Sequence, residues 1–167
     1  GLIDDITGWD FANNDAIPMD DVGHGTEMAG LVLQNGAAAN TRIMPLKVVS
    51  GDGIAGPLNI ARAITYAVEH GAQVLNLSLN SNQAYPAVSE AINRALEAGI
   101  SVVASAGNQG TAEPQFPASL PGVLAVGACN AKGVLYDWSA RAGSKKEQYI
   151  SATSDGTSAQ VDAKASA

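Results

Sequence analysis

Two consecutive stretches of the chain share one pattern, an amphipathic helix closed by a glycine and followed by an apolar strand. They comprise the helix 57–70, Gly71 and the strand 74–79, and then the helix 86–98, Gly99 and the strand 100–104. Strands that alternate with helices need crossover connections and therefore pair in parallel, with both faces of the sheet buried. A further apolar strand, 123–128, extends the series. The pattern predicts an α/β fold, a three-layer sandwich with a mostly parallel central sheet.

Composition limits the kind of protein. The chain has 167 residues, of which 46% are apolar and 15% charged, and this predicts one globular domain over residues 1–167. A net charge of −7, with clustered basic residues only at Lys145 and Lys146, argues against a nucleic-acid partner. Cys129 is the only cysteine, which excludes an internal disulfide. No apolar run is long enough for a membrane span, and no signal-peptide pattern opens the chain.

A histidine flanked by two glycines opens another helical stretch. Met28, Leu31 and Val32 follow His24 at helical spacing, which predicts that the imidazole lies at the first turn of a buried helix and faces a cleft. A catalytic histidine needs such a position at the edge of a cleft, so His24 is a candidate catalytic residue. The alternative is a glycine-rich turn that carries a surface histidine by chance.

Asn108 follows the apolar strand 100–104 and lies within the segment 107–110, which has a glycine at each end. In parallel sheets, functional groups collect at the carboxyl ends of the strands, where Ser78 to Asn80 also fall. The Asn108 amide could donate a hydrogen bond to the oxyanion of an acyl-transfer intermediate. The alternative is an ordinary turn, since Gly-Asn-Gln-Gly is a common turn sequence.

Three motifs, taken in chain order, resemble those of the subtilisin-like serine proteases, or subtilases. They are His24-Gly25-Thr26, the segment 102–110 around Asn108, and Gly156-Thr157-Ser158, which match the family's histidine, oxyanion and nucleophile motifs. The segments 8–11, 47–49 and 75–79 extend the resemblance over almost the whole chain. It implies a secreted hydrolase, a serine endopeptidase that is extracellular or periplasmic and acts on peptides or proteins. Ser158 and His24 would be its catalytic residues, and Asn108 its oxyanion donor.

The resemblance also implies where a substrate would bind. The family stretch that corresponds to residues 50–56 pairs with the substrate as an added strand, which predicts contacts from Gly53, Ile54 and Ala55. Pocket walls in this fold come from loops that correspond here to Ser78, Leu79 and Asn80. For residues 50–56 the alternative is a plain turn.

The acidic N-terminal segment has the ligands for a calcium site. Asp10, Asn13 and Asp15 supply hard oxygen atoms at close spacing, as calcium requires. Some members of the family carry a calcium ion after a similar Gly-Trp-Asp-Phe sequence, so the resemblance implies that calcium is a structural cofactor. The alternative is an Asx-turn loop whose side chains bond their own backbone.

Both ends of the chain depart from the family pattern. The family's triad aspartate precedes the histidine by roughly thirty residues. Asp4 superficially matches it, but the register set by residues 8–11 places the aspartate strand before Gly1. After Ser158 the family's buried helix is replaced by a mostly polar sequence.

A second register at this end makes residues 149–152 a strand and puts the nucleophile beyond Ala167. The chain is therefore predicted to be truncated or degenerate at both ends, lacking the N-terminal Asp strand and the C-terminal helices. Two alternatives to an active enzyme stay open. One is an inactive fragment or pseudoprotease that acts as a peptide-binding or structural module. The other is a calcium-stabilised module that presents the edge 50–56 to peptides.

Overall fold

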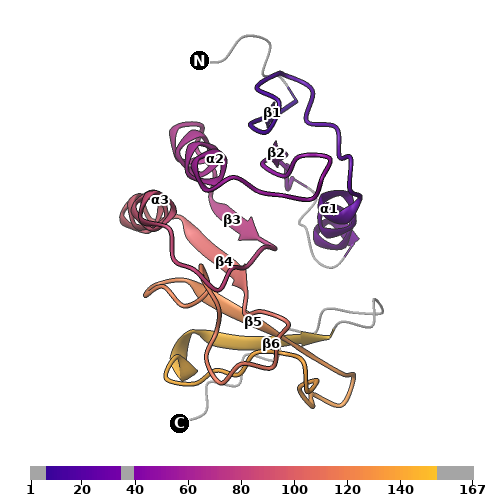
Figure 1. Cartoon of the computed structure of the whole chain (residues 1–167), viewed down its shortest axis with the longest axis vertical. Helices are drawn as coiled ribbons and strands as arrows, with labels where there is room; N and C mark the ends of the chain where they lie inside the picture. The colour runs from indigo at the N-terminus through magenta and orange to yellow at the C-terminus, as the bar shows by residue number, and fades with distance from the viewer. Residues whose placement is uncertain (1–6, 35–39, 154–167) are drawn as a thin grey trace. The chain divides into compact units, whose positions relative to one another are not determined.

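The structure, a computed structural model, describes residues 7–34 and 40–153. The chain divides into two units, which Figure 1 shows with their helices and strands labelled. Unit 1 is formed by residues 1–72 and 85–98, and unit 2 by residues 73–84 and 99–167. The α/β class and the parallel sheet predicted from the sequence are confirmed.

Unit 1 contains a two-stranded parallel ribbon. β1 (Trp9–Asp10) pairs with β2 (Leu46–Lys47), and Asp10 lies opposite Lys47. Pro45 comes just before β2, and its carbonyl accepts the N–H of Trp9 at 3.2 Å. β2 therefore begins only after Pro45, because proline cannot donate to a ladder. The ribbon packs on buried side chains that form the core of this unit, namely Trp9, Phe11, Ala63 and Tyr66.

Two amphipathic helices of unit 1, α2 (Pro57–Glu69) and α3 (Pro86–Glu97), lie side by side. Each begins at a proline, whose missing N–H costs nothing at the first helical position. Gly71 ends α2 with a φ of +73°, and the N–H of Ala72 then reaches back to the Ala67 carbonyl at 3.0 Å. This closure satisfies carbonyls at the helix end and needs glycine for its left-handed backbone.

The helix that carries the candidate histidine, α1 (His24–Gln34), is present but not buried. None of its residues is buried, and Leu31, Val32 and Leu33 are between 37% and 55% exposed. The prediction of a buried helix is therefore wrong for the part of the chain that the structure describes. The spacing of apolar residues is that of a helix, but burial depends on which element packs against the apolar face.

Unit 2 is built on a four-stranded sheet in which all neighbouring strands are parallel, in the order β3-β4-β5-β6. The strands are β3 (Val74–Leu77), β4 (Ser101–Ser105), β5 (Leu124–Cys129) and β6 (Tyr149–Thr153). A short 3-10 helix, η1 (Lys146–Gln148), precedes β6. Buried and partly buried residues alternate along β5, as expected of a strand packed on both faces.

Lys145 holds the turn that leads into β5. Its ammonium donates to the backbone carbonyls of Ala118 at 2.9 Å and Val123 at 3.2 Å, and also to that of Leu120. Burial lowers the pKa of Lys145 below its ordinary value. Three carbonyl acceptors thus surround one charged group, which fixes the path of the chain before β5.

Neither unit contains a membrane-spanning helix among its described residues, because none is both long and apolar enough. The prediction of one domain over residues 1–167 stays a prediction.

Candidate functional site

His24 is the first residue of α1, and the segment before it is fixed by Asp20. One carboxylate oxygen of Asp20 accepts the N–H groups of Val22 at 3.0 Å and Gly23 at 2.8 Å. The other accepts the N–H of Thr26 at 2.8 Å and its hydroxyl at 2.7 Å. These hydrogen bonds hold the pKa of Asp20 well below its ordinary value. Those from Thr26 have the largest effect, followed by those from the N–H groups of Gly23 and Val22. The start of α1 is therefore capped by a charged group, as helix N-termini favour.

Lys47 of β2 connects this segment to the N-terminal loop. Its ammonium contacts the carboxylate of Asp10 at 2.9 Å and also that of Asp21, three residues before His24. Hydrogen bonds with Asp21 and Asp10 raise the pKa of Lys47. Burial raises the pKa of Asp10, but hydrogen bonds from Lys47 and Asn13 outweigh it, so that the pKa of Asp10 is lowered.

The predicted calcium ligands form hydrogen bonds within their own loop. Asp10 accepts the N–H of Ala12 and both the N–H and the side-chain amide of Asn13, each at 2.8 Å. Asp15 accepts the N–H of Ile17 at 2.8 Å, and its backbone pairs with that of Asp10. Over residues 7–34 and 40–153, no three His, Cys, Asp or Glu side chains are grouped to hold a metal ion. The loop has the Asx-turn character of the alternative, and calcium binding by Asp10, Asn13 and Asp15 stays a prediction.

The predicted substrate edge in unit 1 is a turn with its own hydrogen bonds. The Ile54 carbonyl accepts the N–H of Ser50 at 3.0 Å and its hydroxyl at 2.9 Å, and the Ile54 N–H donates to Asp52 at 3.1 Å. Gly53 has a φ of +81°, and the Ile54 side chain is 64% exposed. The Gly53 N–H also donates to the Ser50 carbonyl at 2.8 Å, so an added strand could use neither the N–H of Gly53 nor the backbone groups of Ile54 without breaking the turn.

In unit 2 the structure brings two of the predicted segments to one edge of the sheet. Leu77 of β3 lies opposite Ala104 of β4 in a parallel pair, so Ser78 to Asn80 and Asn108 both follow the carboxyl ends of neighbouring strands. Within the described part of the chain, the exposed side chain of Asn108 forms no hydrogen bond. Its amide donors are thus available to a ligand at the edge where parallel sheets bind their substrates.

The backbone around Asn108 is held on both sides. The N–H of Ala106 donates to Val126 of β5 at 2.9 Å, and the N–H of Gly110 donates to Trp138 at 2.7 Å. The Gly107 carbonyl accepts the N–H of Ala140 at 2.9 Å. A rigid loop of this kind can present an amide to a developing charge without reorganising.

Sequence reasoning missed Gln115, which lies under this loop. Its side chain is buried, and its amide nitrogen donates to the side-chain oxygens of Asn82 and of Gln109, at 3.2 Å for the latter. A Cβ on Gly107 would lie 2.1 Å from the Gln115 amide oxygen, and the φ of +112° at this residue also favours glycine. Gln115 belongs to no recognisable motif, and the only signal in the sequence is a polar residue between Pro114 and Pro117.

Some of the remaining predicted residues lie outside the described part of the chain, and the others belong to different units. Ser158, the predicted nucleophile, and Asp4 lie outside the described residues. His24 belongs to unit 1 and Asn108 to unit 2. Residues 149–152 form most of β6, as the second register for the C-terminal end required.

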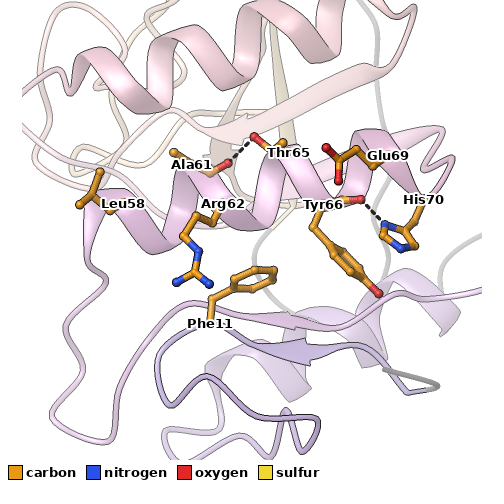
Figure 2. Close-up of a pocket in the computed structure, with 8 residues that line it drawn as sticks. All are labelled: Phe11, Leu58, Ala61, Arg62, Thr65, Tyr66, Glu69 and His70. Carbon is orange, nitrogen blue, oxygen red and sulfur yellow. Dashed lines mark hydrogen bonds between the residues drawn. The ribbon is translucent and has the colours of Figure 1, made fainter. Parts of the chain in front are cut away.

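A pocket of about 480 Å³ lies elsewhere in unit 1, on one side of α2 (Figure 2). In it the Arg62 guanidinium lies 5.6 Å from the centre of the Phe11 ring. His70 stacks on Tyr66 at 3.8 Å between ring centres. None of the residues predicted for catalysis, substrate binding or metal binding lines this pocket, so it is separate from the predicted chemistry.

Comparison with known proteins identifies the relatives of the chain. A thermophilic serine proteinase of Bacillus sp. (strain AK1) is 40% identical over 131 residues, which cover 74% of this chain and 33% of that protein. Thermitase of Thermoactinomyces vulgaris is 36% identical over 129 residues, which cover 72% of this chain and 46% of that protein. The chain thus spans less than half the length of these two relatives.

Two solved structures of proteases also resemble this chain. A cold-adapted subtilisin-like serine proteinase matches with a TM-score of 0.73 and 29% identity, over 81% of this chain and 51% of that one. A lanthipeptide protease matches with a TM-score of 0.71 and 25% identity, over 87% of this chain and 46% of that one. The model of the subtilase family covers residues 2–163. The chain therefore belongs to the subtilase family.

Proposed function

We propose that the protein is a serine endopeptidase that hydrolyses peptide bonds through an acyl-enzyme. The observation that carries the proposal is the exposed Asn108 amide on its rigid loop, beside Ser78 to Asn80 at the carboxyl edge of a parallel sheet. Membership of the subtilase family over residues 2–163 supports the same reading. His24, at the capped first turn of α1, supplies the base.

The reaction has two acyl-transfer steps. The Ser158 hydroxyl oxygen attacks the carbonyl carbon of the substrate while His24 takes the hydroxyl proton, and Asn108 donates to the oxygen that becomes negative. The C–N bond then breaks, and His24 returns the proton to the leaving amine. Water repeats the sequence on the ester and releases Ser158. An aspartate that fixes the tautomer of the imidazole completes such a site.

A fluorophosphonate probe followed by peptide mapping tests the assignment. Because the probe reacts once and irreversibly, it reports even a slow site, and we expect stoichiometric labelling at Ser158. The His24→Ala variant should not be labelled, whereas His70→Gln, which alters the other histidine, should be labelled normally. Equal labelling of the wild type and His24→Ala would contradict the mechanism.

An inactive module is the second candidate function, and β6 favours it. In the register that makes residues 149–152 a strand, Ser158 does not match the nucleophile motif, and these residues do belong to β6. Residues 1–167 would then act as a peptide-binding or structural module. Complete absence of probe labelling, together with peptide binding detected by calorimetry, would support this candidate over the enzyme.

We further propose that the protein acts outside the cytoplasm, in the extracellular space or the periplasm, on peptides or proteins. The resemblance to secreted subtilases supports this location. Detecting the protein in the culture medium or periplasmic fraction of its source cells tests it, and confinement to the cytoplasm would contradict it.

A further inference from the structure

The carboxylate of Asp10 has no free acceptor position. Its side chain is only 1% exposed, and one oxygen accepts the N–H groups of Ala12 and Asn13. The other accepts the Asn13 side-chain amide and contacts the Lys47 ammonium at 2.9 Å. An ionised carboxylate offers about four lone pairs, and all four are used here. A calcium ion could bind Asp10 only if one of these partners left.

Lys47 is placed to neutralise Asp10 by the pairing of β1 with β2. The two residues lie opposite each other in the parallel register, and the Lys47 side chain is only 10% exposed. A buried carboxylate needs both hydrogen bonds and an opposite charge, and this pair supplies both. The same ammonium contacts Asp21, whose side chain is 45% exposed. One lysine thus bridges two acidic segments that are eleven positions apart along the chain.

A bound calcium ion would also neutralise the carboxylates. It would gather carboxylates from one or two loops and cancel their repulsion, but only while the ion is present in solution. An ammonium on a side chain is held by covalent bonds, and it directs up to three N–H groups at acceptors. Its effect does not depend on the concentration of any ion.

We propose that Lys47 is a built-in cation that takes the place of calcium at the Asp10 loop and ties this loop to the segment before His24. The loop is therefore organised without metal, and Asp10, Asn13 and Asp15 form a hydrogen-bonded turn. This inference goes beyond the proposed endopeptidase function and holds whether or not the chain is active.

Thermal unfolding of the full chain tests the proposal in three solutions, namely EDTA, calcium chloride, and sodium chloride at the same ionic strength. We expect the midpoint of the wild type to be the same in EDTA and calcium. The Lys47→Met variant should unfold about 5 to 10 °C lower in EDTA, because a buried carboxylate loses its counter-charge. Calcium, but not sodium, should restore part of the loss, because Asp10 and Asp21 then face the space that the ammonium left.

A matched control is Lys132→Met, which alters an exposed lysine of unit 2 and should leave the midpoint unchanged. The proposal is overturned if EDTA lowers the wild-type midpoint and calcium restores it, or if Lys47→Met is as stable as the wild type. It is also overturned if sodium restores Lys47→Met as well as calcium does, because the effect would then be general screening. None of these readouts uses peptide hydrolysis, so failure of the proposed function cannot be mistaken for failure of this inference.

Discussion

At the scale of single residues, Gly107 decides how Asn108 is presented. Its φ is +112°, a conformation that side chains with a Cβ avoid, and the Gln115 amide occupies the space that a Cβ would need. Gln115 in turn contacts Asn82 and Gln109, so a change at Gly107 would disturb both loops at this edge of the sheet. The glycine of the motif is required by packing as well as by its backbone angle.

We therefore expect Gly107→Ala to destabilise unit 2 more than Gly133→Ala does. Both glycines have positive φ, but nothing lies within 4 Å of a Cβ at Gly133. Gly133 has a φ of +75°, closer to the left-handed region than the +112° of Gly107, so the difference reports backbone strain together with the overlap with Gln115, on the order of 1–3 kcal/mol. Urea unfolding of the two variants measures it, and equal free energies of unfolding would show that neither the backbone angle nor Gln115 makes Gly107 special.

The sequence indicated Asn108 but not Gln115. A motif with a glycine at either end can be recognised in the sequence, and the amide of Asn108 made this residue a candidate oxyanion donor. Gln115 acquires its importance only when the loop 110–118 folds back, so that Ala106 accepts the N–H of Gln115 at 2.8 Å. No local pattern reports that contact.

At the scale of elements, α1 depends on Asp20. Its four hydrogen bonds to the turn and first residues of the helix explain why the pKa of Asp20 is lowered. A carboxyl whose pKa is lower in the folded state stabilises the fold at pH values above its unfolded pKa, here near the ordinary 3.8. This stabilisation is lost as the pH falls from there toward the folded-state pKa.

Asp20→Asn should therefore cost about 1 kcal/mol at neutral pH, the usual net value of a lost hydrogen bond, because an amide cannot accept from all four donors, and should flatten the loss of stability between about pH 4 and pH 2. Chemical unfolding at several pH values measures both effects. Glu97→Gln, at an exposed carboxylate of α3, is the control and should keep the wild-type acid sensitivity. An Asp20→Asn curve parallel to that of the wild type would show that Asp20 does not titrate with folding.

Helix boundaries were predictable where the signals are local. α2 and α3 begin at proline and end before glycine, as expected, and their apolar stripes contain the buried residues Ile60, Ile64, Val88 and Ile92. The burial of α1 was predicted wrongly from equally good spacing. Periodicity identifies the apolar face of a helix, but it carries no information about the partner that covers that face.

At the scale of the whole molecule, we expect residues 1–167 alone to hydrolyse peptides slowly. We expect that Asp4 does not act as the acid that orients His24, and a histidine without its orienting acid loses about four orders of magnitude in rate. A continuous assay with a chromogenic peptide measures the turnover. A chain extended at its N-terminus to include an aspartate-bearing strand should be faster, and the same chain with that aspartate changed to Asn is its control. Full turnover by residues 1–167 would show that an acid within them, such as Asp4, completes the site.

Long-range pairing explains most of what the sequence could not show about the candidate site. Lys47 is 37 positions from Asp10 and 26 from Asp21, and the three meet only because β1 and β2 pair in one particular register. The fold class followed from repeated local patterns, whereas these contacts depend on the tertiary structure that the patterns produce.

The anchoring of the Asn108 loop also sets an order of events during synthesis. A ribosome releases the chain from its N-terminus, so β4 and Asn108 emerge well before Trp138 and Ala140, which hold the loop in place. Asn108 can therefore reach its final geometry only after some thirty further residues have left the exit tunnel. The loop that carries it becomes fixed only when the sheet of unit 2 is nearly complete.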